Sequence, residues 1–277
     1  MKDSLVIAVT NSKGGVGKTT TSLNLGATLS AAGKRVLLID ADPQGNLTAA
    51  WGFTPAEHQN TLAKLILTAI DSPEDMDIDL SRAVLHTESG VDLIPANNRL
   101  SDAAARLQVM RMSQYEAVKE TARPCEKILD GVVAQLKDSY DYIIIDCGLK
   151  YELLTVNALS ASDYCIIPVQ AHFLASEGIP EVLETVRVVQ EKFNPNLKVA
   201  GILLTMYQSR PQLCQDVRNG VDEVYGTEFH IFECPIEYTI KIAECPAAGK
   251  SIFDYAPKNP AAKSYQNLAM EVMRLAG

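Results

Sequence analysis

The stretch LVIAVTNSKGGVGKTTTS, from Leu5 to Ser22, places five apolar residues before a glycine-rich loop and a helical pattern after it. A buried strand that turns through glycines into a helix is the context that a phosphate-binding loop requires. The glycines allow backbone N–H groups to turn toward an anion, and the N-terminus of the following helix adds its positive end. The stretch therefore predicts an α/β fold that binds a phosphate group at this loop.

Two lysines lie five residues apart in this loop. Lys18 would reach the β- and γ-phosphates of a nucleotide, and the hydroxyl of Thr19 would ligate Mg²⁺. The usual spelling G-x-x-x-x-G-K-[ST] is not kept, because Ser12 stands at the position of the first glycine. Lys13 has no evident task in holding a single nucleotide. The residues expected to contact the nucleotide are Lys13, Gly14, Gly15, Val16, Gly17, Lys18, Thr19 and Thr20.

Apolar runs alternate with helical patterns along the rest of the chain. Such runs, buried on both faces, are typical of a parallel sheet. The predicted strands cover residues 5–9, 35–40, 91–96, 142–147, 164–170 and 199–206, and the clearest predicted helices cover 19–32, 176–193, 211–225 and 260–275. Between 54 and 138 the pattern is looser and mostly helical. With no repeat or long linker, we expect one doubly wound α/β domain spanning residues 1–277, with a mostly parallel sheet and helices on both faces.

Composition limits the classes of partner. The chain carries 25 Lys+Arg and 34 Asp+Glu, a net charge of −9, which gives no support for a large basic face that binds nucleic acid or membrane. No apolar run approaches the roughly 18 residues of a membrane span, and the first run is too short for a signal peptide, so we expect a cytoplasmic protein. The six cysteines and four histidines lack zinc-type spacing.

Aspartates stand at the ends of two predicted strands. Asp146 ends YIIIDC, and a hydrophobic strand finishing in aspartate suits a carboxylate that holds Mg²⁺ through water. In IDADPQGN, Asp40 ends another strand and Asp42 follows, where a carboxylate could orient the attacking water. The alternative is that these aspartates cap helices or turns. After Thr205 the chain reads TMYQSR, without the aspartate that recognises guanine, so ATP is the expected nucleotide.

Six segments in order resemble the ParA/Soj partition ATPases, from Leu5 to about Arg274: KGGVGKTT, LLIDADPQGNLT, DYIIIDC followed by LLTVNAL, IIPVQA, GILLTMYQSR and KIAECPAAGKSIFDYAPKNPAAKSY. The resemblance implies a P-loop ATPase with a deviant Walker A motif, which forms a sandwich homodimer on ATP. In such a dimer the residue matching Lys13 reaches the phosphates held by the other subunit. The family's dimer binds DNA without sequence preference, and a ParB-type centromere-binding protein stimulates hydrolysis. The implied role is segregation of a plasmid, chromosome or mobile element.

The residues and the resemblance together define the predicted site. The catalytic residues are Lys13, Lys18, Asp40 and Asp42, and the magnesium ligands are Thr19, Asp42 and Asp146.

The sequence departs from the family in two places. After Asp146 it reads Cys147-Gly148-Leu149-Lys150, where family members usually carry prolines. Two interpretations are open: tolerated drift, since loosening by glycine costs only about 1 kcal/mol, or altered coupling between the γ-phosphate and this segment with slow hydrolysis. The segment CPIEYTIKIAECP lacks the arginines often found there, and residues 201–277 carry seven Lys+Arg against nine Asp+Glu. The candidate DNA contacts are Arg210, Arg218, Lys241 and Lys250.

Three alternatives remain at this point. A MinD-like membrane-cycling ATPase would need a basic amphipathic C-terminal helix, and the last helical pattern offers only Lys263 and Arg274. A nitrogenase-iron-protein-like reductase needs two cluster cysteines per subunit, and the placement of Cys147 does not match. The third is an ATP-switched positioning scaffold with very slow hydrolysis. Because the loop begins about ten residues into the chain, we expect no N-terminal helix-turn-helix domain.

Overall fold

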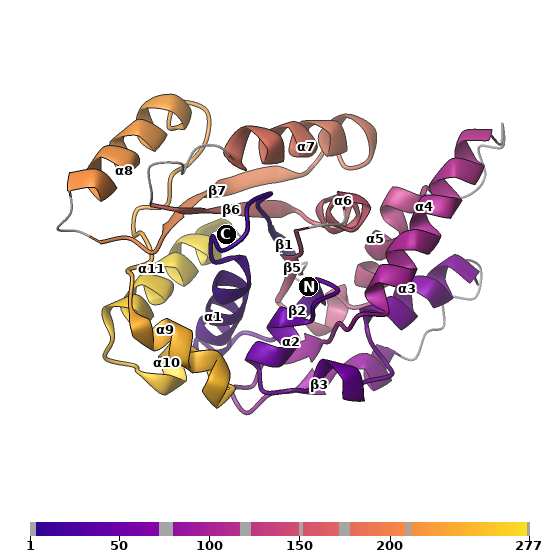
Figure 1. Cartoon of the computed structure of the whole chain (residues 1–277), viewed down its shortest axis with the longest axis horizontal. Helices are drawn as coiled ribbons and strands as arrows, with labels where there is room; N and C mark the ends of the chain where they lie inside the picture. The colour runs from indigo at the N-terminus through magenta and orange to yellow at the C-terminus, as the bar shows by residue number, and fades with distance from the viewer. Residues whose placement is uncertain are drawn as a thin grey trace.

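The protein is built on a seven-stranded sheet with the order β3-β4-β2-β5-β1-β6-β7, drawn in Figure 1. The computed structural model describes residues 4–71, 80–116, 123–149, 152–171, 178–208 and 212–275. The strands are β1 (Leu5–Val9), β2 (Val36–Ala41), β3 (Leu85–His86), β4 (Asp92–Ile94), β5 (Tyr142–Cys147), β6 (Tyr164–Gln170) and β7 (Lys198–Thr205). The helices are α1 (Lys18–Ala31), α2 (Asn46–Ala50), α3 (Leu62–Asp71), α4 (Leu100–Glu116), α5 (Ile128–Ala134), α6 (Glu152–Ser160), α7 (Ile179–Lys192), α8 (Gln212–Tyr225), α9 (Ile240–Glu244), α10 (Ile252–Tyr255) and α11 (Pro260–Leu275).

Helices cover both faces of the sheet, because successive residues of a strand point to opposite sides. Ile143 and Ile145 of β5 pack in one core cluster with residues of α3 to α7. Ile144 packs in a second cluster with residues of α1, α2 and α11. Figure 1 shows these two helical layers on either side of the strands. The chain therefore adopts the doubly wound α/β fold that the sequence predicts.

The structure places all six predicted strands within two residues of their expected ends. The helix predicted at 19–32 runs from 18 to 31, and the last helix has the predicted bounds. The starts of the helices predicted from residues 176 and 211 lie outside the described residues. The sequence did not predict β3, which pairs antiparallel with β4 at one edge of the sheet.

The other edge of the sheet is β7, and its outer side is partly occupied. Residues 230–236 exchange backbone hydrogen bonds with β7, including Ile202 N–H to the carbonyl of His230 at 2.9 Å and Phe232 N–H to the carbonyl of Ile202 at 3.1 Å. These contacts form a short parallel bridge between Ile202 and Ile231. The backbone groups of β7 are therefore paired on both sides in this region.

The strand register decides which side chains meet at the carboxyl edge of the sheet. β5 lies between β1 and β2, with Asp146 opposite Val9 on one side and opposite Asp40 on the other. The phosphate-binding loop leaves β1 at this same edge. In a doubly wound sheet, ligands bind at the carboxyl ends of strands where the strand order reverses, so this edge is the expected site.

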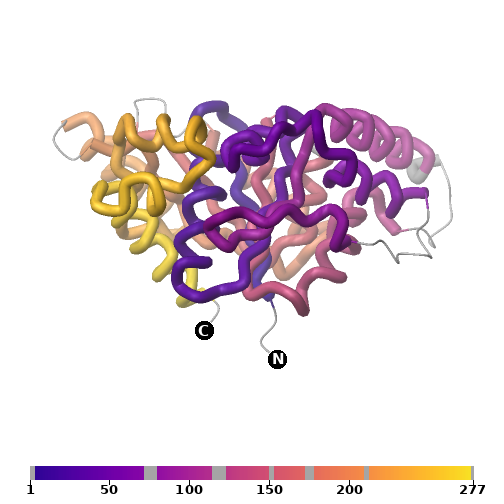
Figure 2. Tube along the Cα trace, turned by 90° about the horizontal axis from the view of Figure 1, so that it is seen from below, coloured from indigo at the N-terminus to yellow at the C-terminus, as the bar shows by residue number. Residues whose placement is uncertain are grey.

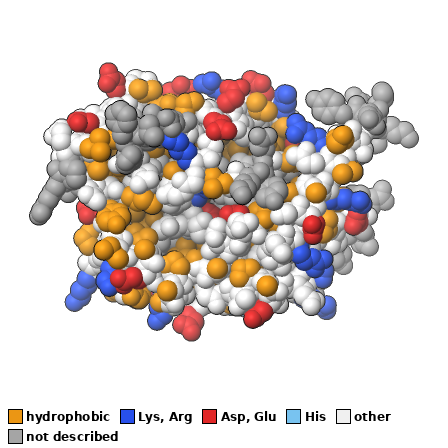
Figure 3. All heavy atoms as spheres, viewed as in Figure 1, with side chains coloured by type: hydrophobic (Ala, Val, Ile, Leu, Met, Phe, Trp, Pro, Cys, Tyr) orange, Lys and Arg blue, Asp and Glu red, His pale blue; other side chains and the backbone are white. Residues whose placement is uncertain are grey.

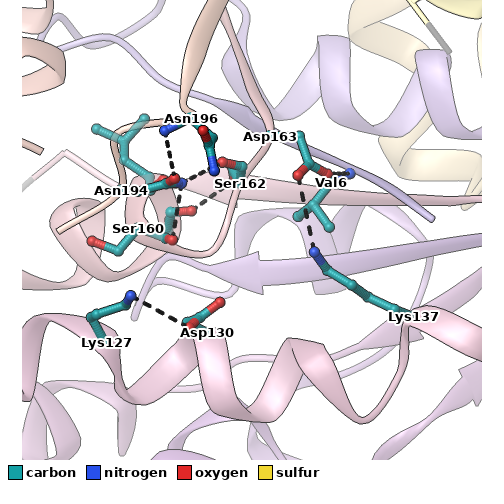
Figure 4. Close-up of polar contacts among 11 residues, drawn as sticks. Val6, Lys127, Asp130, Lys137, Ser160, Ser162, Asp163, Asn194 and Asn196 are labelled. Carbon is teal, nitrogen blue, oxygen red and sulfur yellow. Dashed lines mark hydrogen bonds and ion pairs between the residues drawn. The ribbon is translucent and has the colours of Figure 1, made fainter. Parts of the chain in front are cut away.

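Polar side chains hold together the opposite end of the sheet, where β1 and β6 begin, as Figure 4 shows. Asp163 accepts a hydrogen bond from the N–H of Val6 at 2.8 Å and lies 4.0 Å from the ammonium group of Lys137. Asn194, which follows α7, donates to the carbonyl of Ser162 at 2.7 Å. These contacts fix the start of β1, so the phosphate-binding loop follows a strand that is held at its far end.

Figure 2 shows where the parts of the chain lie along the long axis of the molecule. The C-terminal part, in orange and yellow, lies at one end, and α3 and α4, in purple and magenta, lie at the other. The first strand and helix run between them. None of the described helices combines the length and the apolar character needed to cross a membrane.

Candidate nucleotide-binding site

The loop between β1 and α1 takes its shape from glycines. Gly15 and Gly17 have φ angles of 73° and 87°, in the left-handed region that glycine adopts without steric cost. Gly17 is also the residue before α1. The loop is also held by β7, because the hydroxyl of Thr205 at the end of that strand donates to the carbonyl of Val16 at 2.8 Å. The loop is open at Gly15, because no heavy atom of the described residues, its chain neighbours aside, lies within 4 Å of the position of a Cβ there.

Lys18 opens α1 and lies deep in this loop, with 8% of its surface exposed. Its ammonium group donates to the carbonyl of Lys13 at 2.9 Å. Burial lowers the pKa of Lys18, and the carboxylates of Asp146 and Asp42 partly oppose this effect. A cation that has already lost most of its water is well prepared to bind an anionic group. Thr20 is half-buried in the same first turn of α1.

Asp146 joins the end of β5 to α1. Its carboxylate accepts hydrogen bonds from the hydroxyls of Thr19 at 2.7 Å and Ser22 at 2.8 Å. It is completely buried, and burial raises its pKa to about 7, with a further contribution from the charge of Asp40. The structure thus brings two predicted magnesium ligands, Thr19 and Asp146, into direct contact. Ser22 was not predicted, although its position one turn after Thr19 could have indicated it.

Asp40 is buried beneath the loop that follows β2. Its carboxylate accepts hydrogen bonds from the N–H and hydroxyl of Thr48, at 2.8 and 2.7 Å, and from the N–H of Asp42 at 3.1 Å. Burial raises its pKa to about 6. Because its oxygen atoms are occupied by the loop itself, this geometry favours a positioning role for Asp40 over direct catalysis. Thr48, which sequence reasoning missed, completes this arrangement.

Asp42 lies half-buried where the loops after β2 and β5 meet. Its carboxylate accepts hydrogen bonds from the N–H of Gln44 at 3.0 Å and from the side chain of Asn46 at 3.1 Å. Gly148 packs against it, since a Cβ on Gly148 would lie 3.1 Å from Oδ1 of Asp42. The altered segment after β5 therefore contacts the predicted catalytic aspartate. Lys150 lies outside the described residues.

Asn11, at the start of the loop, is a third residue that the sequence did not predict, after Ser22 and Thr48. It is buried, and its side-chain amide contacts both the end of β6 and the backbone of Lys13. A polar residue directly after an apolar strand was the available signal. Gly14 carries a different contact, because a Cβ there would lie 3.2 Å from Cδ1 of Leu149.

The candidate DNA contacts come from separate segments. Arg218, on α8, donates to the carbonyl of Glu233 at 3.1 Å. Lys241, on α9, donates to Glu244 at 2.7 Å, and Lys250 is exposed before α10. Arg210 lies outside the described residues. On the face drawn in Figure 3, basic side chains are scattered among acidic ones.

Comparisons with known proteins cover nearly the whole chain. A family model described as an AAA domain matches residues 4–199. The chain is 40% identical to the sporulation initiation inhibitor protein Soj of Bacillus subtilis over 267 residues, which is 96% of this chain and 97% of Soj. It is 35% identical to the chromosome partitioning protein ParA of Caulobacter vibrioides over 270 residues, 97% of this chain and 93% of ParA. The crystal structure of cobyrinic acid a,c-diamide synthase from Mycobacterium smegmatis with bound ADP and magnesium has a TM-score of 0.80 and 33% identity, covering 98% of this chain and 94% of that one.

Proposed function

This chain belongs to the ParA/Soj family of partition ATPases, and from this premise we propose that it is an ATPase that dimerises on ATP. The ATP-bound homodimer binds DNA without sequence preference, and a ParB-type partner stimulates hydrolysis to segregate a plasmid, chromosome or mobile element. The protein works in the cytoplasm, on the nucleoid when it is bound to DNA. The observation that carries the ATPase proposal is the contact of Thr19 with Asp146 beside the buried Lys18.

The donor set fits a magnesium nucleotide. The hydroxyl of Thr19 and the carboxylate of Asp146 are oxygen ligands of the kind that Mg²⁺ prefers, and they lie 2.7 Å apart. Magnesium, when bound, neutralises charge on the phosphates. Lys18 would hold the β- and γ-phosphates, and the glycine-rich loop would surround them with backbone N–H groups. The ADP and magnesium in the M. smegmatis structure support this assignment.

Hydrolysis would depend on Asp42 in this chain and on Lys13 from the second subunit. Asp42 would orient the attacking water, and Asp40 would hold the loop that carries Asp42. Lys13 would stabilise the phosphates across the dimer, as a cation supplied in trans does in other nucleotide hydrolases. The carboxylate of Asp42 is engaged by its own loop, at Gln44 and Asn46, which supports slow hydrolysis until a partner acts.

The two lysines provide the test of this proposal. Mass measurement in solution should show a dimer with ATP or a non-hydrolysable analogue and a monomer with ADP. Lys13→Ala should retain nucleotide binding and lose ATP-driven dimerisation and hydrolysis. Lys18→Ala should lose nucleotide binding itself. A wild-type protein that stays monomeric under every condition would overturn the proposal, and two variants that fail alike would overturn the division of roles.

The occupied carboxylate of Asp42 also favours a second candidate, an ATP-switched positioning scaffold that hydrolyses too slowly to act as a catalyst. Steady-state turnover, measured alone and then with duplex DNA and the cognate ParB-type protein, separates the two. Stimulation by the partner supports the partition ATPase. Unchanged turnover, together with ATP-driven dimerisation, supports the scaffold.

A further inference from the structure

The start of α7 packs directly against the phosphate-binding loop. Gly178 precedes α7, and a Cβ added to it would lie 2.5 Å from Oδ1 of Asn11 and 3.2 Å from Cγ of Lys13. In a close-packed interior a methyl group cannot occupy that space unless the loop moves. The φ angle of Gly178 is −86°, which any residue adopts. Glycine is therefore required here by the contact with Asn11 and not by the backbone conformation.

Asn11 receives this contact in a single fixed orientation. It is 2% exposed, and its amide nitrogen donates to the carbonyl of Pro168 in β6 at 2.7 Å. Its amide oxygen accepts the N–H of Lys13 at 2.9 Å. A flipped or displaced amide would leave buried polar groups without partners, which costs about 1–3 kcal/mol for each group. The side chain of Asn11 thus connects β6 to the backbone of Lys13.

Lys13 and Lys18 are held by different parts of the fold. Lys13 follows Asn11, whereas the loop just before Lys18 is held at Val16 by the hydroxyl of Thr205. Lys18 itself is the first residue of α1. A disturbance at Asn11 should therefore reach Lys13 first. It reaches Lys18 only through the ammonium group, which donates to the carbonyl of Lys13 at 2.9 Å, a bond that Lys18 would exchange for the phosphates when a nucleotide binds.

We propose that Asn11 and Gly178 are positioning residues for Lys13. Asn11 fixes the backbone from which the Lys13 side chain extends, and the missing side chain of Gly178 leaves space for the Asn11 amide. This inference rests on the proposed function, in which Lys13 acts across an ATP-bound dimer. A further contact joins the same elements, because the hydroxyl of Ser12 lies 3.5 Å from the carbonyl of Gly178.

The test compares Gly178→Ala with Gly220→Ala. Gly220 lies on α8, and apart from the nearby backbone of α8 no heavy atom in the described part of the chain lies within 4 Å of the position of its Cβ, so alanine fits there freely. Gly178→Ala should weaken ATP-driven dimerisation and slow hydrolysis by about tenfold or more, as expected when a catalytic group is displaced. Its affinity for a fluorescent ATP analogue should stay within about twofold of wild type, since the backbone before Lys18 is held by Thr205 and Lys18 itself by α1. Gly220→Ala should match wild type in all three measurements.

A second variant shows whether the effect passes through Asn11. Asn11→Ala should reproduce the same pattern, with dimerisation lost and nucleotide binding kept. The double variant Asn11→Ala/Gly178→Ala should be little worse than Asn11→Ala alone, because the tightest contact of the added methyl, 2.5 Å from Oδ1 of Asn11, is then absent and only the looser one to Cγ of Lys13 is left. Additive losses would contradict the inference. Should Gly178→Ala fail to fold, Asn11→Ala alone decides.

Lys13→Ala, measured in the same assays, distinguishes a failure of the proposed function from a failure of the positioning role of Asn11 and Gly178. If wild type does not dimerise on ATP, the proposed function fails and this inference fails with it. If wild type dimerises, Lys13→Ala does not, and both Gly178→Ala and Asn11→Ala behave as wild type, then the positioning role alone is overturned.

Discussion

Two buried carboxylates, Asp40 and Asp146, lie opposite each other at the ends of neighbouring strands. Each has a raised pKa, about 6 for Asp40 and about 7 for Asp146, because burial disfavours the charged form. Hydroxyl donors from Thr19, Ser22 and Thr48 only partly offset this cost. A divalent cation would favour the charged form of both carboxylates. Its binding is therefore expected to offset the cost of burying them.

The raised pKa of Asp146 makes the stability of the nucleotide-free protein depend on pH. Its folded-state pKa of about 7 exceeds the ordinary 3.8, so the folded protein binds more protons than the unfolded chain between these values. Stability should therefore fall as pH rises through this window. Asp146→Asn keeps the size of the side chain but cannot ionise. Its amide oxygen can accept from one of the two hydroxyls, whereas its amide nitrogen would have to donate to the other.

We expect urea unfolding in EDTA to show a smaller loss of stability for Asp146→Asn than for wild type between about pH 5 and about pH 8. The same variant should bind magnesium nucleotide more weakly. Identical pH slopes for the two proteins would show that Asp146 does not titrate in this range.

At the scale of single residues, the sequence could predict the part of the site that comes from local motifs. Lys18 and Thr19 follow from the loop, and Asp146 from the end of a hydrophobic strand. Asn11 and Gly178 could not be paired in this way, because they are far apart in the chain and meet only through the packing of α7. The positioning role of Asp40 also depends on Thr48, which a later helix supplies.

At the scale of elements, α1 packs closely on β2 through a glycine. A Cβ on Gly26 would lie 2.8 Å from Cδ2 of Leu38, a side chain that is completely buried. Glycine within a helix costs about 1 kcal/mol relative to alanine, so its presence here suggests that close packing offsets the loss. The phosphate-binding loop leads directly into α1, so this packing also holds the C-terminal end of the loop.

Alanine substitutions in two helices should therefore have opposite effects on stability. Gly26→Ala should destabilise the protein by about 1–2 kcal/mol, because the added methyl overpacks the core at Leu38. Gly220→Ala should stabilise it by about 0.5–1 kcal/mol, because α8 has open space at that position and gains helix propensity. Denaturant unfolding measures both. If both variants are stabilised, the interface between α1 and β2 is looser than the structure implies.

The elements that could be predicted from the sequence were those with a complete hydrophobic pattern. Strands β1, β2, β5, β6 and β7 each contain five or more apolar residues and were found. β4 has only three residues, and it was found because the mostly apolar run extends from 91 to 96. β3 spans only Leu85–His86, too short to show any periodicity, and it is defined by pairing with β4. The segment from 54 to 138 contains α3, α4 and α5, together with β3 and β4. The bounds of these elements could not be predicted, because the apolar pattern in this segment is less regular than in the central strands.

For the molecule as a whole, the balance of charge limits DNA binding. The net charge is −9, and the candidate contact Lys241 is paired with Glu244, whose hydrogen bond raises the pKa of Lys241. Glu244 also accepts the hydroxyl of Tyr255 at 2.8 Å. The exposed pair stabilises little by itself, but it competes with any phosphate for the ammonium group.

Glu244→Gln should therefore strengthen nonspecific DNA binding in the presence of ATP. Releasing one cation adds up to one phosphate contact, which steepens the dependence of log affinity on log salt by about 0.9. Fluorescence anisotropy with a duplex at several salt concentrations gives both quantities. Glu191→Gln on α7 removes an equal charge elsewhere and serves as the control. Equal gains for the two variants would indicate a general charge effect and exclude Lys241 as a specific contact.

The edges of the sheet have a consequence for how copies of the protein meet at high concentration. Long unpaired strand edges recruit other chains and lead to aggregation. Among the described residues, one edge is the two-residue β3, and the other, β7, already exchanges hydrogen bonds with residues 230–236. Copies of the protein can therefore lie close together at high concentration without pairing edge to edge. Contacts between copies would have to form through side-chain surfaces and not through backbone pairing of the sheets.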